Sequence, residues 1–256
     1  MSMKYMRWAA GYAGTYTPAA SESNSAYPAS NLGLEKLSKC WRSNGDLTAV
    51  DITIDLTSGK AIDLVGLANH NFTSGVTLSI AAGTTTGYSD FSDTITYRAG
   101  SAYKILSATQ TYRHWRIRIT DASNTYGFLE AGNLLLGPLT TPAKGVSMDP
   151  GISIERISQN LTVESELGSP SVDRLIDRKR ITLSFRNMGT SETTDYVTFV
   201  EALAEESNPL FLIPDTTVYD GWYCRLQGSP MEQRQFYTNI KPLTFLEDGS
   251  GKRMAA

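Results

Sequence analysis

The feature that most constrains the fold is a two-residue alternation of apolar and polar side chains between residues 41 and 137. It is clearest over residues 50–56 and 115–119, where every second residue is apolar. Successive side chains of an extended strand point to opposite faces. The pattern therefore predicts strands with one face on a core and the other toward water or a partner. Because turn signals separate these short strands at near-regular spacing, it also predicts a β-sandwich or jelly roll.

The bulk composition suits one large all-β domain or two ordinary ones. The chain has 256 residues, of which 41% are hydrophobic and 19% charged, which is typical of a globular protein. Its net charge of -3 argues against a general binder of nucleic acid or membrane surfaces. No run approaches the roughly 18 consecutive apolar residues of a membrane-spanning helix, and residues 1–8 lack the apolar region of a secretion signal. We expect Cys40 and Cys224 to be thiols made in a reducing cytoplasm rather than a disulfide.

The distribution of proline, glycine and small polar residues predicts the domain organisation. It comprises an irregular N-terminal arm (1–39), the sandwich (40–138), a linker (139–145), a second β domain (146–247) and a loose tail (248–256). The second domain is expected to hold strands around 152–157, 161–164, 181–185, 210–213, 222–226 and 239–245.

One amphipathic helix is predicted over residues 190–207. Thr190 and Ser191 supply capping groups, and the apolar side chains that follow recur at helical spacing. A charged loop is predicted over residues 173–179. The fold class expected is therefore mainly β, with a sandwich followed by a β domain carrying one helix.

No arrangement of reactive residues indicates catalysis. A zinc site needs three or four closely spaced ligands, and the chain has only two histidines. His70, between two asparagines, either contacts a sugar or divalent ion or closes a strand end, and the structural interpretation is favoured. Asp51 and Asp55 alternate with isoleucines, which favours a solvated face over a pair of carboxylates for glycoside hydrolysis. We expect no enzyme activity, no metal and no cofactor.

Three groups of residues are candidates for contacts. Exposed aromatics in a loop-rich stretch are candidates for contact with a glycan or a partner, or for core packing: Tyr88, Phe91, Tyr97 and Tyr103. A mixed-charge segment is a candidate for salt bridges, either between subunits or within the chain: Asp173, Arg174, Asp177, Arg178, Lys179 and Arg180. Arg116 and Arg118 share the strand face opposite Trp115. They are predicted to form salt bridges with a partner surface or to pair across strands with the row of aspartates, rather than to bind nucleic acid.

The order of Trp41-Arg42-Ser43 and the segments 54–56, 65–71, 115–119 and 132–137 resembles discoidin-like (galactose-binding-like) jelly rolls, especially those in tail-tip proteins of long-tailed bacteriophages. The element order after residue 145 is similar to the tail-tube-like fold of distal tail proteins. In that family the tube-like domain comes first, whereas here the sandwich precedes it.

The resemblance implies a structural protein of the virion tail tip, of the distal tail or baseplate type, made in the host bacterial cytoplasm. It would form a homo-oligomeric ring, hexameric or trimeric, that continues the tail tube, lets DNA pass and attaches tip or fibre proteins. The alternative is a carbohydrate-binding module that mediates attachment to host-surface glycans.

Overall fold

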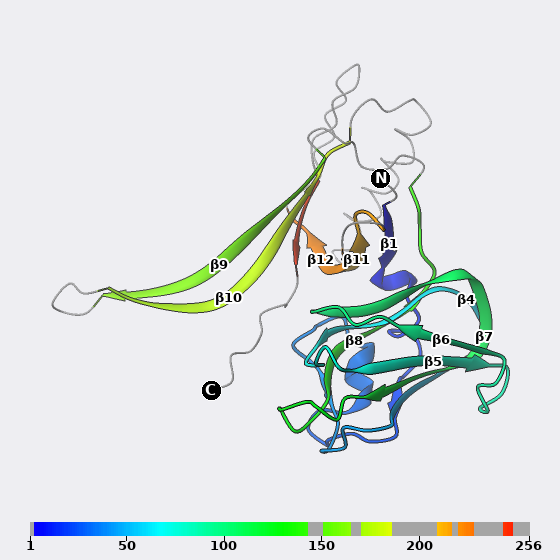
Figure 1. Cartoon of the computed structure of the whole chain (residues 1–256). Helices are drawn as coiled ribbons and strands as arrows, with labels where there is room; N and C mark the ends of the chain where they lie inside the picture. Colours follow the sequence, from blue (N-terminus) through cyan, green and yellow to red (C-terminus); the bar gives the residue numbers. More distant parts are fainter. Residues whose placement is uncertain are drawn as a thin grey trace.

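The computed structural model describes residues 3–142, 151–164, 170–185, 209–216, 220–227 and 243–247, with backbone alone for 158–164 and 170–177. These residues are mainly β and form two antiparallel sheets (Figure 1). The predicted helix over 190–207 and the predicted tail over 248–256 lie outside the described residues. The strands are β1 (Lys4–Arg7), β2 (Ala19–Ala20), β3 (Trp41–Arg42), β4 (Val50–His70), β5 (Thr77–Gly83), β6 (Phe91–Ile95), β7 (Ser101–Thr120), β8 (Glu130–Gly137), β9 (Ile152–Glu164), β10 (Pro170–Leu183), β11 (Leu210–Ile213), β12 (Trp222–Leu226) and β13 (Leu243–Glu247).

The first sheet has the order β3-β8-β4-β7-β5-β6, with β2 also paired to β4. It folds into the two layers of a sandwich because β4 and β7 are long enough to run through both. Their pairing is interrupted between Asp55 and Lys60, and such irregularities bend a strand. Residues 57–59, Thr-Ser-Gly, are one of the turn signals in the sequence, but they do not separate two strands. They form an irregularity inside β4, with Thr57 at φ 60°. The predicted β-sandwich is confirmed.

The two-residue alternation places the sandwich core as expected. Ile52 and Ile54 of β4 pack in one cluster with Trp115 and Ile117 of β7, each at most 4% exposed. The intervening residues face outward and form ion pairs across the two strands. Arg118 binds both carboxylate oxygens of Asp51, at 2.7 and 2.8 Å, which confirms the predicted arginine–aspartate pairing.

The second sheet has the order β1-β11-β12-β13-β10-β9. Its first strand comes from the start of the chain, since Lys4–Arg7 pairs antiparallel with Leu210–Ile213. The prediction of a wholly irregular arm over residues 1–39 is therefore wrong at β1, and two short 3-10 helices, η1 (Trp8–Ala10) and η2 (Ala29–Gly33), lie in the same segment. The free edge of β1 is covered by Thr140 of the predicted linker, which exchanges two backbone hydrogen bonds with Tyr5, at 3.0 and 2.8 Å.

The second half of β4 is buried on both faces, between the sandwich core and the second sheet. Val65 and Leu67 belong to the sandwich core, whereas Leu64 and Ala68 point the other way. Gly66 fits there because a Cβ would lie 2.5 Å from the carbonyl oxygen of Ala102. The residues between the two sheets, called the inter-sheet core below, are Met6, Leu37, Leu64, Ala68, Tyr103, Leu135, Phe211, Ile213 and Tyr223. The sequence predicts that one face of each strand meets water or a partner, and on this face of β4 the partner is the second sheet of the same chain.

Strands β9 and β10 form a two-stranded ribbon that extends away from the rest of the described chain (Figure 1). They pair with each other along their whole length, but β13 pairs only with residues 180–183 of β10. The segment 173–179, predicted as a charged loop, is part of β10, so that prediction is wrong. Pairing with β9 satisfies its backbone groups, and this outweighs the weak strand preference of its charged residues.

Candidate functional site

The structure does not bring the four predicted aromatic residues together. Tyr103 is buried in the inter-sheet core, where its ring centre lies 5.0 Å from that of Phe211. Phe91 lies at the edge of the sandwich core, with its ring centre 6.3 Å from that of Tyr112 and 6.1 Å from that of Trp115. Both are held by other aromatic rings of the chain.

Tyr88 and Tyr97 are half-buried in two further environments. The ring centre of Tyr97 is 5.9 Å from that of His70. Tyr88 lies in the loop between β5 and β6, where the guanidinium carbon of Arg116 is 4.9 Å from its ring centre. The four aromatics therefore contact four different sets of neighbours and do not form one platform.

His70 closes the end of β4, which confirms the structural interpretation. Its Nδ1 accepts the backbone N–H of Phe72 at 3.1 Å, so Nε2 is assigned the proton and donates to the carbonyl of Arg98 at 2.9 Å. Burial disfavours the charged form and lowers the pKa of His70 to about 4. With both ring nitrogens bonded to backbone, the imidazole is committed to the fold.

The mixed-charge segment makes contacts within the chain where its side chains are described. Arg180 pairs with Glu155 across the ribbon at 3.0 Å. The backbone N–H of Lys179 donates to Glu247 at 3.1 Å, and its ammonium lies 5.3 Å from the ring centre of Trp222. Arg178 has a buried Nε without a hydrogen-bond partner among the described residues. The side chains of Asp173, Arg174 and Asp177 lie outside the description.

A surface that the sequence analysis missed combines aromatic rings with one ion pair. The guanidinium of Arg42 lies between the rings of Tyr27 and Phe128, at 4.1 and 4.7 Å from their centres. Its Nε donates to Glu130 at 2.5 Å. Tyr126 is 50% exposed, and its ring centre is 6.3 Å from that of Phe128. We call these five residues the aromatic–arginine face.

Local hydrogen bonds hold the loop that presents Tyr126. Arg42 of β3 and Glu130 of β8 are directly opposite each other in the strand register. Asn71 then fixes the end of the loop: its amide N–H donates to the carbonyl of Phe128 at 2.8 Å, and its oxygen accepts the N–H of Glu130 at 2.7 Å. Tyr126 donates its own N–H to the side chain of Asn124 at 3.0 Å. The ring is thus displayed on a loop with a defined backbone.

A buried carboxylate, that of Asp121, anchors the turn between β7 and β8. Asp121, 1% exposed, accepts the backbone N–H of Thr73 at 2.8 Å and a longer bond from Asn124 at 3.3 Å. Gly127 takes a φ of 73°, which few other residues adopt without strain. The sequence signal for this face was the Tyr126-Gly127-Phe128 triplet in a polar turn, but its partners come from distant segments.

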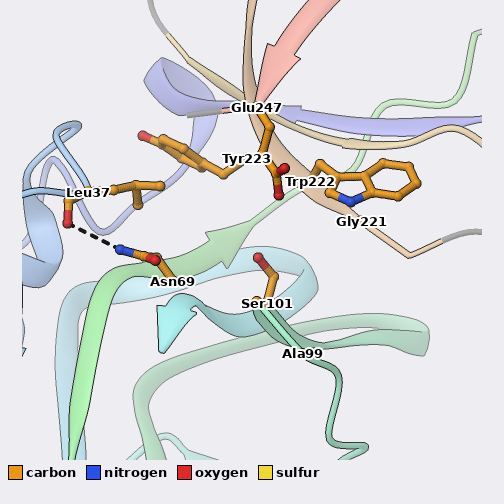
Figure 2. Close-up of a pocket in the computed structure, with 9 residues that line it drawn as sticks. Leu37, Asn69, Ala99, Ser101, Gly221, Trp222, Tyr223 and Glu247 are labelled. Atoms are coloured by element: carbon orange, nitrogen blue, oxygen red, sulfur yellow. Dashed lines mark hydrogen bonds between the residues drawn. The ribbon is translucent and has the colours of Figure 1, made fainter. Parts of the chain in front are cut away.

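A shallow hollow lies where the sandwich meets the second sheet (Figure 2). Asn69 and Ser101 line it from the sandwich, and Trp222, Tyr223 and Glu247 from the second sheet. Its empty space is about 270 Å³, part of which is open solvent, and the hollow has room for about one water molecule. Such a space is too small to hold a sugar ring, and we assign it to packing between the sheets.

The described residues hold no group of three or more potential metal ligands. Among the helices described, none has the length and apolar character needed to cross a bilayer. Burial raises the pKa of the Cys40 thiol, which disfavours its reactive thiolate.

Comparison with known proteins gives likenesses to solved structures alone. No protein-family model and no curated protein matches the chain. A family 32 carbohydrate-binding module from C. perfringens NanJ, solved with galactose, is 12% identical with a TM-score of 0.40, covering 54% of this chain and 99% of its own. Chitosan-binding module 1 from a chitosanase/glucanase of Paenibacillus sp. IK-5 is 17% identical with a TM-score of 0.42, covering 50% and 98%. A fucose-binding module from Streptococcus pneumoniae is 12% identical with a TM-score of 0.41, covering 50% and 97%.

Proposed function

We propose that the sandwich is a carbohydrate-binding module and that the aromatic–arginine face attaches the protein to a surface polysaccharide. The observation that carries this proposal is the half-exposed ring of Tyr126 beside Phe128, on a loop fixed by hydrogen bonds. A pyranose has an apolar C–H face that stacks on an aromatic ring, and hydroxyls that need polar partners. The Arg42–Glu130 pair supplies donors and acceptors without net charge, which suits a neutral sugar.

A purely structural interpretation explains only part of this face. The stacking of Arg42 between Tyr27 and Phe128, with Glu130 as its partner, ties the edge strand β3 to β8. That clamp does not require an aromatic side chain at Tyr126, which leaves half of its surface in solvent. Single exposed apolar residues are common, so the association of Tyr126 with the clamp is what favours binding.

The substitution Tyr126→Ala tests the proposal. We expect about three- to tenfold weaker binding to the polysaccharide, because a stacked aromatic pair contributes roughly 0.5–1.5 kcal/mol. Tyr126→Phe keeps the ring and should retain most of the affinity. Ligands would be found on a glycan array and affinities measured by calorimetry. Ile154→Ala, which removes another partly exposed apolar side chain on the ribbon, is the matched control. Unchanged affinity in a folded Tyr126→Ala protein would contradict the proposal.

The second candidate function is a structural protein of a phage tail tip that assembles into a ring, and the projecting ribbon favours it. A two-stranded ribbon is at best marginally stable alone in water, and an edge strand offers unpaired backbone groups. Among the described strands β9 pairs only with β10. A second copy of the chain on this edge would stabilise the ribbon. The protein would then be located in the virion, with tail-tube and tail-tip proteins as its partners.

We expect the assembling protein to form discrete rings in negative-stain images and to sediment as one closed oligomer. A variant in which a short Asn-Gly turn replaces residues 158–177, so that Ile157 still pairs with Arg178, should sediment as a monomer while binding glycan as before. If the intact chain is a monomer across the accessible concentration range, it does not assemble into a ring by itself, which contradicts the second candidate function.

A further inference from the structure

The outer face of the layer formed by β4, β7, β5 and β6 carries two arginines whose hydrogen bonding differs. Arg118 uses Nε and one Nη to bind both oxygens of Asp51, at 2.7 and 2.8 Å. The nearest approach of Arg116 to the same carboxylate is 3.8 Å, which is beyond hydrogen-bond distance. The Nε of Arg116 is buried and has no hydrogen-bond partner among the described residues. The Arg116 side chain is 27% exposed, and the N–H groups of its two Nη atoms are the donors that a ligand would meet.

The charges around Arg116 leave one cation uncompensated. Asp51 is the carboxylate shared by the two arginines, and two positive charges against one negative leave a local charge of +1. Asp55, the next outward carboxylate along β4, is bound at both oxygens by Arg113, at 2.7 Å each. This local excess contrasts with the net charge of -3 on the whole chain. An anionic group would compensate it.

The residues beside Arg116 in the sheet are small. The strand register places Thr53 of β4 and Ala81 of β5 on either side of it, with Ser92 of β6 next in the row. Arg116 itself alternates with core residues, so all four positions lie on the outward face. These neighbours are small, and two of them carry hydroxyls.

Tyr88 holds the guanidinium in place from the loop at the end of this row. Its ring centre is 4.9 Å from the guanidinium carbon of Arg116. Tyr88 adopts a φ of 51°, unfavourable for a residue other than glycine. Asp90 closes the same loop by accepting the N–H and the hydroxyl of Thr84, at 2.8 and 3.0 Å. The loop thus maintains a costly backbone conformation that places an aromatic ring against an arginine.

We propose that Arg116 is the anchor of a second sugar subsite, which binds the carboxylate of an acidic sugar residue, with Thr53 and Ser92 near enough in the row to meet its hydroxyls. The guanidinium fork matches a planar carboxylate with two parallel N–H donors. The inference rests on the proposed function in taking a polysaccharide as the ligand, but it concerns different residues from the aromatic–arginine face.

The Nε–H group of Arg116 belongs to the same planar guanidinium, so its resonance in a proton–nitrogen NMR spectrum reports on this subsite. Titration with sodium glucuronate should shift this resonance and reach saturation, whereas glucose should leave it in place. Arg116→Gln should weaken glucuronate binding by about tenfold or more, because it removes a charged hydrogen-bond pair. Arg116→Lys keeps the charge but not the fork and should fall between. Arg113→Gln, which removes an arginine already paired with Asp55, is the matched control.

Two results would overturn the inference. The first is an Arg116 resonance that does not shift with glucuronate. The second is an equal response to sodium acetate at the same ionic strength, which would point to a carboxylate of a protein partner instead of a sugar. Failure of the proposed function gives a different pattern. In that case Tyr126→Ala leaves polysaccharide binding unchanged. The NMR titration of Arg116 with glucuronate is a separate measurement, and its outcome does not depend on that result.

Discussion

The Trp41→Ala variant is expected to lose about 3–5 kcal/mol of unfolding free energy, the usual cost of deleting a buried tryptophan. Trp41 is 0% exposed in the sandwich core. Its indole N–H also donates to the carbonyl of Glu22 at 3.1 Å and to the hydroxyl of Ser23 at 3.0 Å. The substitution therefore leaves a large cavity and also detaches the segment before β3. Urea unfolding followed by circular dichroism measures the loss.

Two milder variants separate packing from hydrogen bonding at this position. Ser23→Ala removes one acceptor and should cost about 1 kcal/mol. Trp41→Phe retains an aromatic ring without the N–H, so its loss should lie between those of the other two variants. Because Arg42 follows in the same strand, Trp41→Ala should also loosen the clamp on Phe128 and weaken glycan binding in the folded protein. A Trp41→Ala protein as stable as the natural chain would contradict the assigned core.

The alternation of apolar residues was sufficient to predict the sandwich and its outer ion pairs. Once Ile52 and Ile117 are placed in the core, Asp51 and Arg118 must face outward, and their opposite charges predict the pairing that is observed. The bend at Thr57 could not be predicted from the same signal. Residues that favour turns also favour a strand irregularity, and the difference lies in whether pairing with β7 resumes beyond it.

The assignment of β1 to the second sheet depends on contacts that local sequence does not encode. Lys4–Arg7 and Leu210–Ile213 are four residues each, and neither is long enough for its periodicity to identify a partner two hundred positions away. The same holds for the aromatic–arginine face. Tyr27, Arg42 and Tyr126 lie on three separate segments. They meet on one surface through the register of β3 with β8 and the backbone hydrogen bond from Arg42 to Tyr27, at 3.1 Å.

The two sheets are expected to unfold as one unit because Tyr103 and Phe211 join them. Their rings meet edge to face, with centres 5.0 Å apart and an interplanar angle of 73°. Both side chains are buried, at 4% and 1% exposure. We expect each alanine variant to lose about 3–5 kcal/mol of unfolding free energy. The double variant should lose about 0.5–1.5 kcal/mol less than the sum, since the first deletion already removes the aromatic contact.

The double-mutant cycle needs a control pair without contact. Phe91 packs with Tyr112 and Trp115 in the sandwich, so Phe91→Ala and Phe211→Ala should be additive. A Tyr103–Phe211 pair that is also additive would mean that the sheets stabilise themselves separately. Binding provides a second readout. At temperatures where Tyr103→Ala remains folded it should bind glycan as the natural chain does, because its ring is buried in the inter-sheet core, whereas the half-exposed ring of Tyr126 neighbours Phe128. The aromatic residue that stabilises the junction and the one that meets the ligand would then be distinguished by two measurements on the same variants.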